Sequence, residues 1–180
     1  MRVIAGAFKG RRLKTASWDG LRPTSDKLRE TLFNVLARRI ADARVLDGYA
    51  GTGAVGIEAL SRGASHVTFV ESNRRATALI EANLALCGIE GGYTIHSTDV
   101  VTALQRMPAG GPFDLMLFDP PYDAAGVRDA LDAAAAHLGE NGLIVLERAT
   151  RTSPDPPPAL TITREVRSGD STLTFLSRAR

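Results

Sequence analysis

The sequence predicts an α/β protein built on a doubly wound, mostly parallel seven-stranded sheet. Three observations predict this fold. Short apolar strands alternate with helical segments from residue 43 to residue 147, and a glycine-rich loop at 51–56 follows the first strand. Two further strands, at 159–166 and 171–177, have no helix between them, which indicates an antiparallel hairpin at one edge of the sheet. Sheets of this kind bind ligands at the carboxyl ends of their strands.

Each element is predicted from its periodicity and from the residues that end it. Apolar or alternating runs bounded by turn residues predict strands at 43–51 (the end of which enters the glycine loop), 66–71, 92–97, 113–119, 142–147, 159–166 and 171–177. Apolar residues at helical spacing predict helices at 23–40, 52–64, 73–88, 99–107 and 124–138. Thr24 or Ser25 is placed to cap the first helix. Residues 3–15 read as a small hairpin or an extended arm, so we divide the chain into a basic arm, 1–22, and a larger domain, 23–180.

Composition excludes several classes of protein. No apolar run approaches the ~20 residues that cross a bilayer, and the N-terminus lacks the apolar core of a signal peptide. The single cysteine, Cys87, cannot form an internal disulfide, which is typical of a reducing, cytoplasmic setting. The three histidines, His66, His96 and His137, are not spaced as a metal pair, so we expect no metal site.

The charge is unevenly distributed along the chain. Residues 1–30 carry eight Lys or Arg and three Asp or Glu, a net +5, whereas the remaining 150 residues carry 14 basic and 17 acidic groups. A basic segment on a mildly acidic body favours a polyanionic partner, although a charged, solvated N-terminus would have the same composition.

The glycine-rich loop allows two interpretations. Gly51, Gly53 and Gly56 match G-x-G-x-x-G between a strand and a helix, and Glu71 follows Gly51 by 20 residues, the spacing of an acid that binds ribose hydroxyls. A dinucleotide-dependent oxidoreductase therefore fits the pattern. Asp47, which ends the strand before the loop, argues against it, because its charge would repel a pyrophosphate. The ammonium and sulfonium groups of S-adenosylmethionine suit an acid at this place.

The segment Asp119-Pro120-Pro121-Tyr122 ends the strand at 113–119 and would lie beside the glycine loop. An exocyclic base amine is a poor nucleophile, and two acceptors on its hydrogens favour attack on a methyl group. The Asp119 carboxylate can provide one acceptor and the Pro120 carbonyl the other, because proline fixes the backbone and cannot extend regular structure. Tyr122 offers a face on which an extruded base can stack. Asp99 is placed to bind an adenine amine, to cap the helix that follows it, or both.

Three segments in this order, RPTSDKLRETLFN, VLDGYAGTGAVGIEALSRGA and FDPPYD, resemble the bacterial small-subunit ribosomal RNA guanine-N2 methyltransferases, the RsmD-like family. The resemblance extends over nearly the whole chain. It implies a Rossmann-like methyltransferase fold, S-adenosylmethionine as the donor, and the N2 amine of one guanine in 16S ribosomal RNA as the acceptor. The sequence departs from the pattern at Tyr49, where many members are expected to have Phe.

The resemblance, the spacing and the basic charge of the N-terminal arm together define three groups of expected site residues. The expected cofactor-binding residues are Asp47, Gly48, Tyr49, Gly51, Thr52, Gly53, Glu71, Ser72, Asp99 and Val100. The expected catalytic residues are Asp119, Pro120, Pro121 and Tyr122. The expected RNA-binding residues are Arg2, Lys9, Arg11, Arg12, Lys14 and Arg22.

Alternatives to this function stay open. D-P-P-Y is shared with amino-methyltransferases that act on adenine or cytosine, and a non-catalytic RNA-binding module would also account for the basic arm. The chain has no inserted domain that could read DNA grooves, so a folded RNA is the expected substrate. We expect a cytoplasmic monomer that acts on 16S ribosomal RNA, within a 30S particle or an assembly intermediate, without membrane contact.

Overall fold

The structure is a computed structural model of the 180-residue chain, and it describes residues 1–16, 18, 25–108, 112–121 and 126–179. Three residues singled out by the sequence, Arg22, Thr24 and Tyr122, lie outside these ranges.

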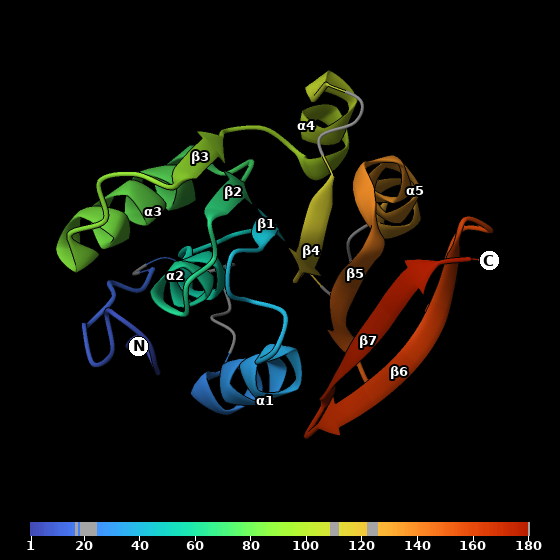
Figure 1. The fold of residues 1–180 in the computed structure, drawn as a ribbon, viewed down its shortest axis with the longest axis horizontal. Helices are drawn as coiled ribbons and strands as arrows, with labels where there is room; N and C mark the ends of the chain where they lie inside the picture. The colour runs from blue at the N-terminus through green and yellow to red at the C-terminus, as the bar shows by residue number, and fades with distance from the viewer. Residues whose placement is uncertain (17, 19–24, 109–111, 122–125, 180) are drawn as a thin grey trace.

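A seven-stranded sheet forms the centre of the molecule (Figure 1), with strand order β3-β2-β1-β4-β5-β7-β6. The first five strands pair in parallel, and β7 pairs antiparallel with both β5 and β6. This confirms the doubly wound sheet with an antiparallel edge hairpin. The strands are β1 (Arg44–Gly48), β2 (His66–Val70), β3 (Tyr93–His96), β4 (Phe113–Phe118), β5 (Leu138–Ala149), β6 (Leu160–Ser168) and β7 (Ser171–Arg178).

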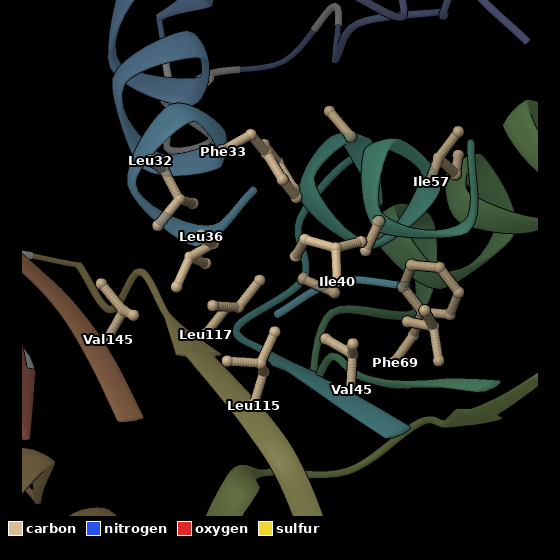
Figure 2. Close-up of a cluster of buried hydrophobic side chains, with 14 of the residues drawn as sticks. Leu32, Phe33, Leu36, Ile40, Val45, Ile57, Phe69, Leu115, Leu117 and Val145 are labelled. Atoms are coloured by element: carbon tan, nitrogen blue, oxygen red, sulfur yellow. The ribbon is translucent and has the colours of Figure 1, made fainter. Parts of the chain in front are cut away.

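Helices cover both faces of the sheet, with α1 and α2 on one side and α4 and α5 on the other (Figure 1). The helices are α1 (Asp26–Leu36), α2 (Ala54–Ser61), α3 (Arg74–Cys87), α4 (Val100–Arg106) and α5 (Val127–His137). Alternate residues of each strand point to opposite faces, so the sheet separates two apolar cores. In the first core, Leu32 and Leu36 of α1 lie over Leu117 and Val145 of β4 and β5 (Figure 2). The helix α1 therefore covers the half of the sheet that leads to Asp119.

The first helix begins at one of the two predicted caps but ends earlier than the sequence predicts. The side chain of Ser25 accepts a hydrogen bond from the Leu28 amide, so Ser25 is the N-cap within the described residues. The helix ends at Leu36, not at Ile40, because the Arg39 amide bonds to the Leu36 carbonyl and starts a turn toward β1. Ile40 still reaches the core and is 1% exposed.

The N-terminal segment is a small hairpin that packs on α2 (Figure 1). The Val3 amide donates to the Arg11 carbonyl at 3.0 Å, and Arg2 and Arg12 form an antiparallel bridge. Val3 and Leu13 bury their side chains in the first core. The hairpin is thus attached to the body of the protein by apolar contacts.

The fifth strand is longer than predicted. It runs from Leu138, directly after α5, to Ala149, and its register with β4 shifts between Phe113 and Leu115. Apart from this strand, the predicted strands match within a few residues. In the part of the chain that the structure describes, no helix has the length and apolar character needed to cross a membrane.

Candidate active site

The carboxyl ends of β1, β4 and β5 form the edge of the sheet at which the predicted site residues meet. A pocket lies there beneath α1, and its polar wall consists of Asp47, Asp119 and Glu147. Its apolar wall is formed by Leu28, Leu32, Val55, Leu117, Phe118, Val145 and Leu173. The pocket therefore combines carboxylates with apolar surface, as expected for an organic ligand that carries positive charge or hydrogen-bond donors.

The glycine-rich loop joins β1 to α2 as predicted. Gly51 and Gly53 have φ values of 55° and 77°, and Gly53 is the N-cap of α2. A Cβ atom on Gly56 would lie 2.2 Å from Cε1 of Phe69 and 2.9 Å from Oδ2 of Asp47. Glycine at position 56 thus permits α2 to approach the sheet and the carboxylate closely.

Asp47 is buried inside this turn. The Gly56 amide donates a 2.8 Å hydrogen bond to Oδ2 of Asp47, and the residue is 4% exposed. Burial raises the pKa of Asp47 well above its usual range, the Gly56 amide opposes this rise, and the charges of Asp119 and Glu71 add to it. A cation bound here would therefore relieve the repulsion among three acids.

Glu71 follows the end of β2 and holds the loop from its other side. Its Oε2 atom accepts from the Gly51 amide at 2.8 Å, and Oε1 accepts from the Asn73 amide at 2.8 Å. Each carboxylate oxygen can accept a second hydrogen bond, so ribose hydroxyls can still be bound here.

The D-P-P segment follows β4 directly. The Asp119 amide lies 3.5 Å from the Gly48 carbonyl, which links the catalytic candidate to the end of β1. Asp119 is half-buried, Pro120 is buried, and Pro121 is exposed. Tyr122, the expected stacking residue, lies outside the described residues.

A further group at the same edge of the sheet consists of Gly48, Tyr49 and Asp99. A Cβ on Gly48 would lie 2.7 Å from the ring of Phe118, and the Tyr49 ring packs edge-to-face on the same ring with centroids 6.0 Å apart. Burial, and then the charge of Asp99, raise the pKa of Tyr49. Tyr49 has a φ of 63°, a left-handed conformation that is uncommon outside glycine.

Asp99 is the N-cap of α4, as one of its two predicted roles requires. Its Oδ1 atom accepts from the Thr102 amide at 2.8 Å, and this bond lowers the pKa of Asp99. The side chain is exposed at the edge, so capping leaves space for a further contact.

Three of the expected cofactor residues occupy other environments. The hydroxyl of Thr52 is directed to the sulfur of Met1, and the Val100 side chain is buried in the second core. Ser72 is exposed after Glu71. The side chains of Thr52 and Val100 thus make contacts within the protein, and their binding of a cofactor stays a prediction.

The five described basic residues of the hairpin, Arg2, Lys9, Arg11, Arg12 and Lys14, are all exposed. Arg11 donates to the Leu86 carbonyl at 3.1 Å and lies over the Phe8 ring. The sixth residue of this group, Arg22, lies outside the described ranges. The charged side chains are thus presented to solvent by a backbone that is itself anchored.

Two buried acids were missed by the sequence reasoning. Glu58 of α2 is 0% exposed and accepts hydrogen bonds from the amides of Ile4 and Ala5, so it fixes the hairpin. Glu147 lies near the end of β5 and lines the pocket beside Asp119. The signal for Glu147 was present in the sequence, because it closes a buried apolar run as Asp47 and Asp119 do.

Comparison with known proteins assigns the chain to a family. The family described as conserved hypothetical protein 95 matches residues 1–177. The chain belongs to this family. It is 37% identical over 147 residues to the ribosomal RNA small subunit methyltransferase D of Escherichia coli K12, covering 82% of this chain and 71% of the relative. It is 35% identical over 175 residues to the protein of the same name from Haemophilus influenzae, covering 94% and 89%.

Solved structures agree with this assignment. The Escherichia coli protein yhhF superposes with a TM-score of 0.87 at 30% identity, covering 99% of this chain and 97% of that one. A ribosomal protein L11 methylase from Lactobacillus delbrueckii, at 19% identity and a TM-score of 0.69, shares the fold. The chain is a methyltransferase with a Rossmann-like fold. Of the two interpretations of the glycine-rich loop, these relatives favour the methyltransferase over the dinucleotide-dependent oxidoreductase.

Proposed function

We propose that this protein uses S-adenosylmethionine to methylate the exocyclic N2 amine of a guanine in small-subunit ribosomal RNA. The observation that carries this proposal is the meeting of buried Asp47, the glycine loop and Asp119 at one edge of a methyltransferase sheet. The names of the relatives from Escherichia coli and Haemophilus influenzae support ribosomal RNA of the small subunit as the substrate.

The donor set at the glycine loop fits S-adenosylmethionine better than a dinucleotide. Glu71 and Asp119 lie near enough to Asp47 for their charges to raise its pKa. Three acids so close together would repel a pyrophosphate. Asp47 would face the cationic methionine end, and Glu71 would accept from the ribose. Asp99 would accept from the adenine amine. When bound, the cofactor supplies an electrophilic methyl group.

The residues of this chain would act mainly by positioning the amine. The Asp119 carboxylate and the Pro120 carbonyl would accept the two hydrogens of the amine, which turns the nitrogen lone pair toward the methyl group. Fixing the reacting atoms in line can lower the barrier by roughly 7–11 kcal/mol at most. As the nitrogen takes the methyl group, the bond between that methyl group and the donor sulfur would break and the sulfur would keep the electron pair. The methylated amine would then be acidic, and its proton would leave to Asp119 or to water. Tyr122 would stack on the extruded base.

The exposed basic residues of the hairpin would position the RNA through its phosphates. Phosphate contacts fix register and orientation without reading sequence. We propose that the protein acts as a cytoplasmic monomer on RNA within a 30S particle or an assembly intermediate, where the folded RNA can be recognised by its shape.

Methyl transfer from labelled S-adenosylmethionine tests this function. Small-subunit particles, free 16S ribosomal RNA and duplex DNA should be offered separately, and we expect label in the ribosomal substrates alone. Titration with S-adenosylmethionine and with NAD is the companion measurement. Binding of NAD without binding of S-adenosylmethionine, or label in DNA alone, would contradict the proposal.

A further inference from the structure

We propose that Glu147 selects guanine by accepting a hydrogen bond from the base N1–H group, next to the amine that Asp119 holds. This inference rests on the proposed function and adds to it the means by which guanine is distinguished from adenine and cytosine. It makes Glu147 a specificity-determining residue that lies outside the D-P-P-Y motif.

The sheet places Glu147 beside Asp119. The parallel pairing of β4 with β5 ends at Phe118 and Leu146. The next residues are Asp119, directly after β4, and Glu147, within the neighbouring strand β5. Leu117 and Val145, two residues earlier, both point toward α1 (Figure 2). Because side chains alternate along a strand, Asp119 and Glu147 return to this same face. Both carboxylates line the pocket under α1.

The Glu147 side chain is held in place. The residue is 8% exposed, and its Oε1 atom accepts from the buried Ser171 hydroxyl at 3.1 Å. Leu173, the register partner of Glu147 on β7, also lines the pocket. Each carboxylate oxygen can accept more than one hydrogen bond, so a carboxylate held in this direction can also accept from a base N–H group at a fixed angle.

Base chemistry explains why a second carboxylate favours guanine. An ionised carboxylate only accepts hydrogen bonds. Beside its N2 amine, guanine carries the N1–H donor, so two adjacent carboxylates meet donors at both positions. Adenine has the N1 lone pair beside its amine, and cytosine has the N3 lone pair. A carboxylate at the Glu147 position would repel either lone pair, whereas Asp119 alone would accept from the amine of any of these bases.

The test uses 2-aminopurine, which keeps the N2 amine and lacks the N1–H group. Small-subunit particles would be reconstituted with RNA that carries either guanine or 2-aminopurine at the methylated position. The kcat/KM for methyl transfer would be measured for the unaltered protein, for Glu147→Gln and for Glu147→Asp. Glu140→Gln is the matched control, because Glu140 is an exposed glutamate near the other end of the same strand.

We expect the unaltered protein and Glu140→Gln to prefer guanine by roughly a hundredfold, the order expected when a hydrogen bond to a charged group cannot form. Glu147→Gln should reduce this preference to less than about tenfold, mainly by slowing transfer to guanine, because a neutral amide accepts more weakly than a carboxylate. Glu147→Asp keeps the charge and should retain part of the preference.

Two results would overturn the inference. One is a guanine preference that is unchanged in Glu147→Gln. The other is an equal loss on both templates, which would show that Glu147 only supports the fold. Absence of any guanine N2 methylation by the unaltered protein would overturn the proposed function itself, so the two failures are distinguishable.

Discussion

Oδ2 of Asp47 accepts a 2.8 Å hydrogen bond from the amide of Gly56, the last glycine of the loop that opens α2. This bond joins the end of β1 to the first turn of the helix and holds the Asp47 carboxyl group in a buried position. The nearby charges of Asp119 and Glu71 make the site unfavourable for an anion and favourable for a cation.

Replacement of Asp47 by Asn should separate stability from cofactor binding. The raised pKa means that the folded protein keeps a proton that the unfolded chain has released. The free energy of unfolding therefore falls as the pH rises from the usual pKa of an aspartate through the raised pKa of Asp47. Asp47→Asn should remove this decline and leave the protein at least as stable at neutral pH.

The same variant should bind S-adenosylmethionine at least about tenfold more weakly, because it loses a buried charge that faces a cation. In the unaltered protein, cofactor affinity should increase with pH as Asp47 ionises, and this increase should be absent in Asp47→Asn. Thermal unfolding and calorimetric titration across a pH series measure both effects. An unchanged affinity in the variant would show that Asp47 does not contact the cofactor.

Gly56→Ala should lower the free energy of unfolding by about 1–3 kcal/mol, the usual effect of overpacking a close contact. The added methyl group would lie 2.2 Å from the Phe69 ring and would also press on the Asp47 carboxylate. Gly91→Ala is the matched control, since a Cβ there meets no atom within 4 Å. Denaturant unfolding of both variants gives the comparison, and equal stabilities would refute the close packing of α2 on the sheet.

The fold was largely predictable because most strands and helices end at a clear sequence signal, such as Gly63 and Gly88 after α2 and α3. The end of α1 and the start of β5 were not predictable, because backbone contacts between residues set where these two elements end and begin. The Arg39 amide closes one such turn on Leu36, and Leu138 pairs with Phe113 at the other.

The candidate site was predictable at positions where an acid ends a strand. Asp47, Glu71 and Asp119 were found in this way, and the structure brings them together. Glu147 carries the same signal, but only the register of β4 with β5 reveals that it lies beside Asp119. The role of Glu58 in holding the hairpin was not predictable, because Glu58 lies within a helix, where an acid ordinarily faces solvent.

Asp119→Ala should reduce methyl transfer by at least about a hundredfold while RNA affinity stays within a few-fold, because an interaction that orients the transition state is removed. Asp132→Ala, at an exposed aspartate of α5, is the control and should keep full activity. Single-turnover transfer and filter binding give the two quantities. If the unaltered protein and Asp119→Ala are equally inert on assembled particles, the chain is a non-catalytic RNA-binding module.

The triple replacement of Arg11, Arg12 and Lys14 by Ala should weaken RNA binding and flatten its salt dependence. The slope of log K against log salt should decrease by roughly 0.7–0.9 for each phosphate that the variant no longer binds. Affinity for S-adenosylmethionine should not change, because these exposed side chains lie on the hairpin and do not line the pocket under α1.

A matched triple of exposed arginines toward the opposite edge of the sheet, Arg151, Arg164 and Arg167, should leave the slope nearly unchanged when replaced by Ala. The opposite interpretation, in which the hairpin serves the fold alone, predicts a different outcome for the first triple. Thermal stability and cofactor affinity would then fall together while the salt slope stays the same.

The chemical identity of the methylated nucleoside is the most direct test of the proposed reaction. Small-subunit particles that lack the modification would be treated with the protein and labelled S-adenosylmethionine, and the RNA digested and analysed by mass spectrometry. We expect N2-methylguanosine at a single position, absent with Asp119→Ala. Label in an adenine or cytosine nucleoside, with none in guanosine, would contradict the proposed reaction.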